Sequence, residues 1–327
     1  MTRANRLFRA VLRLASAACF VHAAPSPAQD YPGKPVRIIV ANAPGSVLEL
    51  AARILAGDLV RSLGQPVVVE SRPGASGIIA YEHVIKQSPA DGYTLALCAS
   101  ELITLPIFIK DLSFDPLRDL PPISLVAEGV SVVFTRYDAP WTDYKSFVSY
   151  VRANPGKANY GTAPFGLSRL IAELVRQKNE LDMIFIPYKG GTAATTPAVL
   201  SGEIQLSVFS EALEPYVKDR RARALVIASS RRVASLPDAP TFAEVGVPEM
   251  PPGFVFAVQG RAGLPKPVVD RLNAAIVAAA QSNEVREQLA RVKLYAVSST
   301  PDAALKKLAE QASLFAAVAK KAGIQPQ

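Results

Sequence analysis

The sequence has few of the residues that build metal centres and thiol active sites. Among 327 residues there are two cysteines, Cys19 and Cys98, two histidines, His22 and His83, and one tryptophan. A zinc site or a cysteine–histidine pair needs several such residues close together. We therefore expect no metal, no cofactor and no catalysis that depends on a thiol.

Long apolar runs are also missing beyond the N-terminus. No later stretch approaches the 18 or so consecutive apolar residues that mark a transmembrane helix. Half of the residues are nevertheless hydrophobic, and a chain of this length can bury a large core. These features indicate a globular protein with two domains or one large α/β unit.

The first 28 residues have the pattern of a secretory signal peptide. Three arginines at positions 3, 6 and 9 precede an apolar stretch at 10–24, and small residues at 26–28 form a cleavage site. We expect removal of residues 1–28 and a periplasmic mature protein. Two alternatives stay open, namely an ordinary N-terminal helix and lipidation at Cys19, although the leucine usual before a lipidated cysteine is missing.

Removal of this segment changes the charge of the protein. It takes away four arginines and no acid, so the formal charge falls from +8 to +4. The remaining excess favours small anions, and it is too small and too scattered for nucleic acid. Only Cys98 and His83 would remain of their kinds, which excludes an intramolecular disulfide.

The stretch Val36 to Leu63 predicts a strand, a turn and a helix. Residues 36–40 are mostly β-branched and apolar, which is typical of a buried strand. Turn residues follow at 42–46, and then leucines and alanines recur every three or four positions, as on one face of a helix. A helix N-terminus after such a turn points free N–H groups at one place, which suits an anion.

Similar units recur along the chain. We predict further strands at 66–70, 94–98, 123–127, 131–135, 158–162, 183–187, 204–209, 224–228 and 254–258, and helices at 78–85, 142–153, 170–175, 194–200, 269–280 and 301–315. The strand at 66–70 is expected to be buried, residues 102–120 to be irregular, and residues 241–244 to form a capping box. Alternating strands and helices predict an α/β protein with doubly wound sheets.

The order of these elements predicts two lobes. The chain is expected to cross between them near residues 128 and 252, so that residues 29–128 and 252–327 form lobe 1 and residues 129–251 form lobe 2. Two lobes joined by a two-strand hinge can close on a small ligand from both sides.

Six short motifs follow one another along the mature chain. They are YPGKPVRIIV at 31–40, RPGASG at 72–77, DGYTL at 91–95, NYGTA at 159–163, PYKGG at 187–191, and RAL at 223–225 followed by LPDAPT at 236–241. Together they resemble the extracytoplasmic solute receptors of tripartite tricarboxylate transporters, also called Bug proteins. The resemblance implies a type II periplasmic binding protein fold and a receptor that delivers a small carboxylic acid to the permease subunits of the transporter.

The resemblance also implies where the ligand binds. In that family, backbone N–H groups and small hydroxyls of two loops, one in each lobe, hold the carboxylate. The corresponding loops are residues 43–49 and 162–168, the same type of turn that the helix pattern marks as an anion site. The candidate ligand-binding residues are Ala43, Pro44, Gly45, Ser46, Val47, Glu49, Thr162, Ala163, Phe165, Gly166, Leu167, Ser168, Lys189 and Gly190.

The sequence departs from the family pattern at both loops. Ser46 and Glu49 stand where the family usually has a second glycine and an aspartate, and Phe165 and Leu167 make the second loop more apolar. The acids often present in the family at the segment 205–209, which would bind a ligand amine, are missing. We therefore expect a carboxylate with a hydrophobic or aromatic body rather than citrate or an amino acid.

Each candidate also has a simpler interpretation. Residues 44–46 can be only a turn, and Glu49 can form a surface pair with Arg53 one helical turn later. Ser168 can be a helix N-cap. Lys189 and His83 can be solvent-exposed, like the basic clusters at 220–223 and 231–232, which otherwise offer a docking surface for a permease.

Two other functions compete with transport. An α/β hydrolase could use Ser46 or Ser168 as its nucleophile, but a serine needs a positioned base, and the mature chain has one histidine and no G-x-S-x-G motif. A receptor that signals to a partner without transport stays possible. A monomer is expected in either case.

Overall fold

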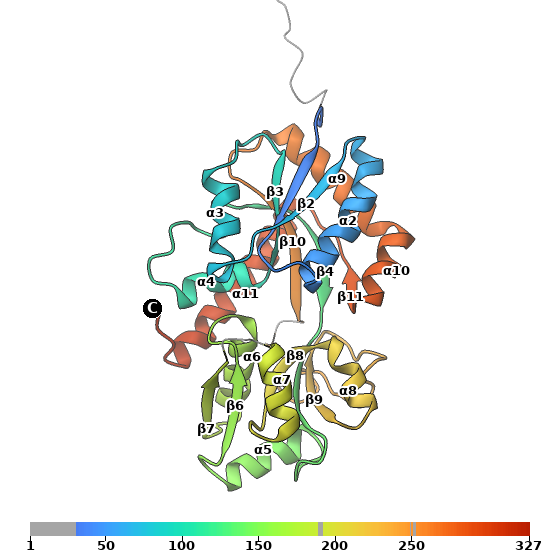
Figure 1. The fold of residues 1–327 in the computed structure, drawn as a ribbon. Helices are drawn as coiled ribbons and strands as arrows, with labels where there is room; N and C mark the ends of the chain where they lie inside the picture. Colours follow the sequence, from blue (N-terminus) through green and yellow to red (C-terminus); the bar gives the residue numbers. More distant parts are fainter. Residues whose placement is uncertain (1–30, 189–191, 249, 251–252) are drawn as a thin grey trace, which may run out of the picture.

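The computed structural model describes residues 31–188, 192–248, 250 and 253–327, which form two α/β lobes stacked end to end (Figure 1). The predicted signal peptide lies outside the described residues. The upper lobe in Figure 1 contains β1 (Val36–Val40), α2 (Val47–Leu63), β2 (Val67–Ser71), a 3-10 turn (Ala75–Gly77), α3 (Ile78–Lys86), β3 (Thr94–Ala99), α4 (Glu101–Phe108), β4 (Pro122–Gly129), β10 (Phe254–Gly260), α9 (Lys266–Gln281), α10 (Asn283–Arg291), β11 (Leu294–Ala296) and α11 (Pro301–Lys321). The lower lobe contains β5 (Ser131–Arg136), α5 (Tyr144–Ala153), β6 (Ala158–Thr162), α6 (Leu167–Lys178), β7 (Met183–Pro187), α7 (Thr192–Ser201), β8 (Ser207–Ser210), the 3-10 turn η2 (Glu211–Leu213), α8 (Glu214–Lys218) and β9 (Ala222–Ala228).

The upper lobe is built on a six-stranded sheet in the order β11-β4-β10-β3-β1-β2. β1 is parallel to β2 and β3, whereas β10 is antiparallel to both β3 and β4, and β11 is antiparallel to β4. The sheet is therefore mixed. The βαβ pattern predicted its parallel half, and the antiparallel half comes from strands that are distant in sequence.

Helices cover both faces of β1, which explains its continuous apolar run. Ile38 and Val40 join the hydrophobic cluster that contains α2 and α9, while Ile39 joins the cluster of α3 and α4. All three side chains are fully buried. A strand with both faces covered has no solvent side, so it needs no polar alternation.

The strand predicted at 66–70 exists as β2, but the expectation that it is buried was wrong. β2 is the edge of the sheet, and the Val68 side chain is 49% exposed. A run of three valines does not distinguish a central strand from an edge strand, because valine packs well against neighbouring side chains in both kinds of strand.

Residues 101–108 form helix α4 where we expected irregular chain. Leu102, Ile103, Leu105 and Phe108 are buried, and this packing outweighs the backbone hydrogen bond that Pro106 cannot donate. The expected capping box at 241–244 does form, with the Thr241 N–H donating to Glu244 and the Glu244 N–H to Thr241 Oγ1, but turns rather than a helix follow it.

The lower lobe has two small sheets. β5 lies between β8 and β9 in an antiparallel sheet, and β6 pairs with β7 in parallel. A bridge between Tyr160 and Leu206 connects the two sheets. The strand predicted at 204–209 is shorter and begins at Ser207.

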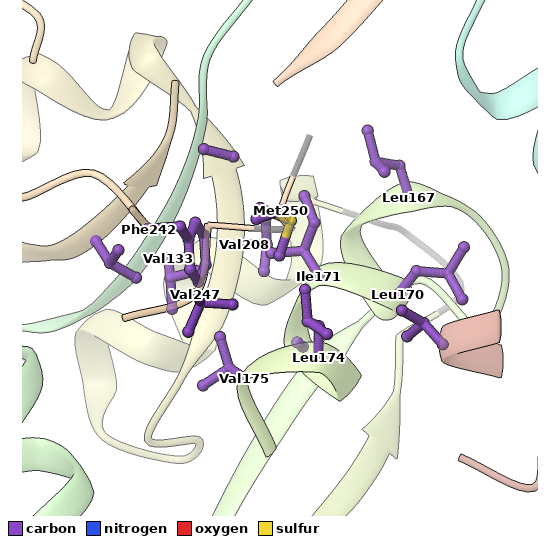
Figure 2. Packing of buried hydrophobic residues seen from close by; sticks show 14 of the residues in the cluster. Val133, Leu167, Leu170, Ile171, Leu174, Val175, Val208, Phe242, Val247 and Met250 are labelled. Carbon is purple, nitrogen blue, oxygen red and sulfur yellow. The ribbon is translucent and has the colours of Figure 1, made fainter. Parts of the chain in front are cut away.

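One hydrophobic cluster continues from lobe to lobe. Ile171 of α6 lies beside Met250 in Figure 2, and the same cluster contains Leu170, Leu174, Val175 and Val208. The same cluster includes buried residues of α11, and the Gln177 side chain on α6 donates a hydrogen bond to the Val318 carbonyl of α11 at 3.0 Å. The last helix therefore contacts both lobes.

Candidate functional site

Two adjoining cavities lie between the lobes. One has a volume of about 310 Å³ and the other about 280 Å³. Asn42, Ala99 and Glu101 line both, so they mark the boundary between them. Each cavity is of the size that suits a small organic molecule.

The N-terminus of α2 forms the upper-lobe wall of the larger cavity. Ser46 is the N-cap, with its hydroxyl accepting from the Glu49 N–H at 3.3 Å, and Ser46, Val47 and Leu48 line the cavity. The first N–H groups of a helix have no partner within the helix. Those of Val47 and Leu48 are thus available at the positive end of a 17-residue helix.

Glu49 does not line either cavity, and the Arg53 interpretation of it is confirmed in part. Arg53 Nε donates to Glu49 Oε1, as expected for residues one turn apart. The pair is not a surface pair on the glutamate side, because the Glu49 side chain is only 3% exposed. Its other oxygen accepts from the Gly45 N–H at 3.3 Å, so one oxygen holds the loop and the other holds the Arg53 side chain on α2.

The N-terminus of α6 faces the same cavity from the lower lobe. Leu167 and Ser168 line it, and Gly166 is the N-cap with φ 102° and ψ −177°, a conformation that favours glycine. No side chain caps this helix. The interpretation of Ser168 as an N-cap was therefore wrong, because the helix begins one residue earlier and the serine lies within its first turn.

The other walls are largely apolar and aromatic, with Ser131 and Ser210 as polar members in the larger cavity. The larger cavity is lined by Leu167, Val208, Phe209, Phe254 and Phe256. In the smaller cavity Phe108 of α4 contacts Phe165 across the gap between the lobes, with ring centroids 5.4 Å apart. An apolar ligand body would be desolvated on several sides here.

Two charged residues line the cavities among the residues that the structure describes. Lys293 forms an ion pair with Glu214 of α8. Glu101, the first residue of α4, is exposed to the open cleft, and the protein around its carboxyl group displaces part of the water there and so raises the pKa of that group. A hydrogen bond of 2.8 Å from Tyr295 to Glu211 lies near the Lys293 pair, so β11 and the lower lobe are linked twice.

The structure brings together part of the predicted ligand-binding set. Ser46, Val47, Leu167 and Ser168 line the larger cavity, and Phe165 and Gly166 line the smaller one. The others with described positions do not line these cavities: Ala43, Pro44, Gly45, Glu49, Thr162 and Ala163. Lys189 and Gly190 lie outside the described residues.

Sequence reasoning missed Asn42, Glu101, Lys293 and the two phenylalanines of β10. Glu101 follows the carboxyl end of β3, beside β1, where ligands of open α/β sheets bind, and that rule could have indicated it. Lys293 and Phe254 come from segments far along the chain, and no local pattern marks them.

The remaining candidate groups for chemistry lie elsewhere. His83 was expected at the surface, but it is buried on α3, with Nδ1 hydrogen-bonded to Gln87 at 3.0 Å. Cys98 is buried in β3, and burial raises the pKa of its thiol. Within the described part of the chain, no histidine lines either cavity and no group of three His, Cys, Asp or Glu residues could hold a metal. None of the described helices is long and apolar enough to cross a bilayer.

The sequence profile of the family "Tripartite tricarboxylate transporter family receptor" matches residues 51–324. The chain belongs to this family of solute receptors. A curated relative, protein BugT of Bordetella pertussis, is 33% identical over 305 residues that cover 92% of this chain and 93% of BugT. This confirms the resemblance, and the family is one of substrate-binding receptors rather than enzymes.

Solved structures of the family share the fold. The periplasmic binding protein BugD superposes with a TM-score of 0.76 at 28% identity, over 91% of this chain and all (100%) of BugD. A protein of R. palustris determined with adipate has a TM-score of 0.78 and 27% identity, over 91% of this chain and 100% of that protein. The expected type II periplasmic binding protein fold is confirmed.

Proposed function

We propose that this receptor captures a small carboxylic acid between its lobes and delivers it to the permease subunits of a tripartite tricarboxylate transporter. In this proposal the protein is periplasmic, is exported by the signal peptide at residues 1–28, acts as a monomer and catalyses no reaction. The lobes are residues 29–128 with 252–327, and residues 129–251.

The observation that carries the proposal is the meeting of two helix N-termini at one cavity. Val47 and Leu48 of α2 face it from one lobe, and Leu167 and Ser168 of α6 from the other. Free N–H groups and helix dipoles from two sides suit one anion, and neither helix end needs a cationic side chain for this. The relative bound to adipate supports a carboxylate as that anion.

The walls support an apolar ligand body. Phe209, Phe254 and Phe256 line the cavity beyond the two helix ends, and no arginine lines either cavity within the described residues. Lys293 also lines this cavity, but it is paired with Glu214. A tricarboxylate such as citrate would therefore place further negative charges against these rings without an unpaired cation of the described lining to neutralise them. We therefore propose a carboxylate with a hydrophobic or aromatic body.

A thermal-shift screen tests this function. Mono-, di- and tricarboxylates are each compared with their neutral amides, because a ligand that binds only the folded state raises the melting temperature. We expect shifts with apolar monocarboxylates and none with their amides. A shift from a sugar or an amide, with none from any acid, would contradict the proposal.

A further inference from the structure

Glu101 lines both cavities of the cleft, and none of the ligand-binding residues predicted from the sequence that the structure describes does so. It begins α4 in the upper lobe, and it lines both cavities. It also reaches the lower lobe, since a Cβ atom placed on Gly166 would lie 3.9 Å from Glu101 Cγ. A ligand that extends from one cavity into the other would therefore lie beside Glu101.

The Glu101 carboxylate is not neutralised by the described protein. The carboxylate accepts a hydrogen bond from the main-chain N–H of Glu101 itself, and the main-chain carbonyl of Glu101 accepts from Thr104 Oγ1 at 2.8 Å. The other charged residue of the described lining, Lys293, is paired with Glu214. Within the described residues, Glu101 is thus the one charge of the cleft without an ion-pair partner.

An unpaired acid between closing lobes has a clear effect on ligand choice. Protein crowding already raises the pKa of Glu101, and lobe closure around a ligand removes more water. A ligand group that donates a hydrogen bond would stabilise the acid, and a second ligand carboxylate would be repelled by it.

We propose that Glu101 determines specificity by selecting ligands that carry a hydrogen-bond donor, an ammonium or hydroxyl group, opposite their carboxylate and by rejecting dicarboxylates. This inference rests on the proposed carboxylate-binding function. It revises one expectation from the sequence: the missing acids at 205–209 do not leave the cleft without a partner for a ligand amine, because Glu101 comes from another element.

A matched ligand series tests the inference. Hexanoate, 6-hydroxyhexanoate, 6-aminohexanoate and adipate share six carbons and one carboxylate and differ only at the far end; a four-carbon series ending in succinate repeats the test at another length. Affinities are measured by calorimetry on the wild-type protein, on Glu101→Gln, and on Glu310→Gln as a control at an exposed position of α11.

The expected result is a change of preference. Wild type and the Glu310→Gln control should bind 6-aminohexanoate about tenfold tighter than adipate, and Glu101→Gln should lose or reverse this ratio while it still unfolds in one cooperative transition. A ratio that stays the same in Glu101→Gln, while the acids still bind, overturns the role of Glu101 alone. If no acid of either series binds the wild type, the proposed function fails together with this inference.

Discussion

The two helix ends that face the cleft are built differently. At α2, Ser46 caps the helix with its hydroxyl, and both oxygens of Glu49 are bonded to the loop and to Arg53. At α6, Gly166 occupies the N-cap position and no side chain caps the helix. The α2 end has a side-chain cap, which takes the Glu49 N–H and leaves those of Val47 and Leu48 available, whereas the α6 end has no side-chain cap.

The sequence pattern gave both helix ends the same role, that of an anion site, whereas the structure distinguishes stabilisation of the fold from ligand binding. The α2 end gains stability from its cap, which contributes about 1 kcal/mol, so its geometry is fixed before a ligand arrives. The α6 end keeps its first N–H groups free of side-chain partners. We infer that removal of a side-chain hydroxyl mainly affects folding at the α2 end and mainly affects binding at the α6 end.

Replacing Gly166 by alanine should give the largest effect. A Cβ at φ 102° and ψ −177° is strained, and we expect a loss of about 2 kcal/mol in the free energy of unfolding together with weaker ligand binding. Chemical denaturation and calorimetry measure the two effects. Gly57→Ala on α2 is the control, since that helical position is open and alanine there should stabilise by about 0.5 kcal/mol. Equal effects at both glycines would show that the α6 end has no special geometry.

The two serines should respond in opposite ways. Ser46→Ala removes the α2 cap and should cost about 1 kcal/mol of stability. Ser168→Ala removes a hydroxyl that lines the cavity but caps no helix, so stability should stay constant while affinity for a carboxylate falls about fivefold. Denaturant titrations and calorimetry on both variants check this. A stability loss at Ser168 and none at Ser46 would reverse the comparison.

The smallest expected effect is a dependence of stability on pH that comes from Glu101, which lies near the N-terminus of α6. The raised pKa of Glu101 means that the folded protein holds this proton where the unfolded chain has lost it. Stability should therefore fall as the pH rises from about 4.3, the pKa of a free glutamate, through the folded pKa. Because carboxyls with lowered pKa, such as Glu214, change stability in the opposite direction, the quantity to measure is the difference in unfolding free energy between wild type and Glu101→Gln. A difference that does not vary with pH would show that Glu101 is solvated like a free side chain.

Local sequence patterns predicted the elements that contain their own signal. The strand Val36–Val40 and helix Val47–Leu63 were predictable because the apolar run and the helical stripe lie within each segment. The burial of β2 was not, since its position at the sheet edge depends on which strands lie beside it. Helix α4 was not predicted because a proline inside a segment, here Pro106, usually indicates that the segment is not a helix. Packing against α3 and α11 makes the helix favourable.

The site was predictable at its two helix ends and not between them. A turn before an amphipathic helix indicated an anion site near Ser46 and another near Ser168, and the family resemblance implied that both face one ligand. It did not show that Glu49 points into its own loop, because that depends on side-chain rotamers. Glu101 and Lys293 line the cleft only because of the way the two lobes pack together, and no motif within a single segment predicts that packing.

In the proposed function, the N-termini of α2 and α6 together hold a carboxylate. Calorimetric titration of the protein with hexanoate and with hexanamide tests it most directly, because the two ligands share size and carbon chain and differ in charge. We predict that hexanoate binds at least about tenfold tighter than the amide. Equal affinities, or tighter binding of the amide, would contradict the claim.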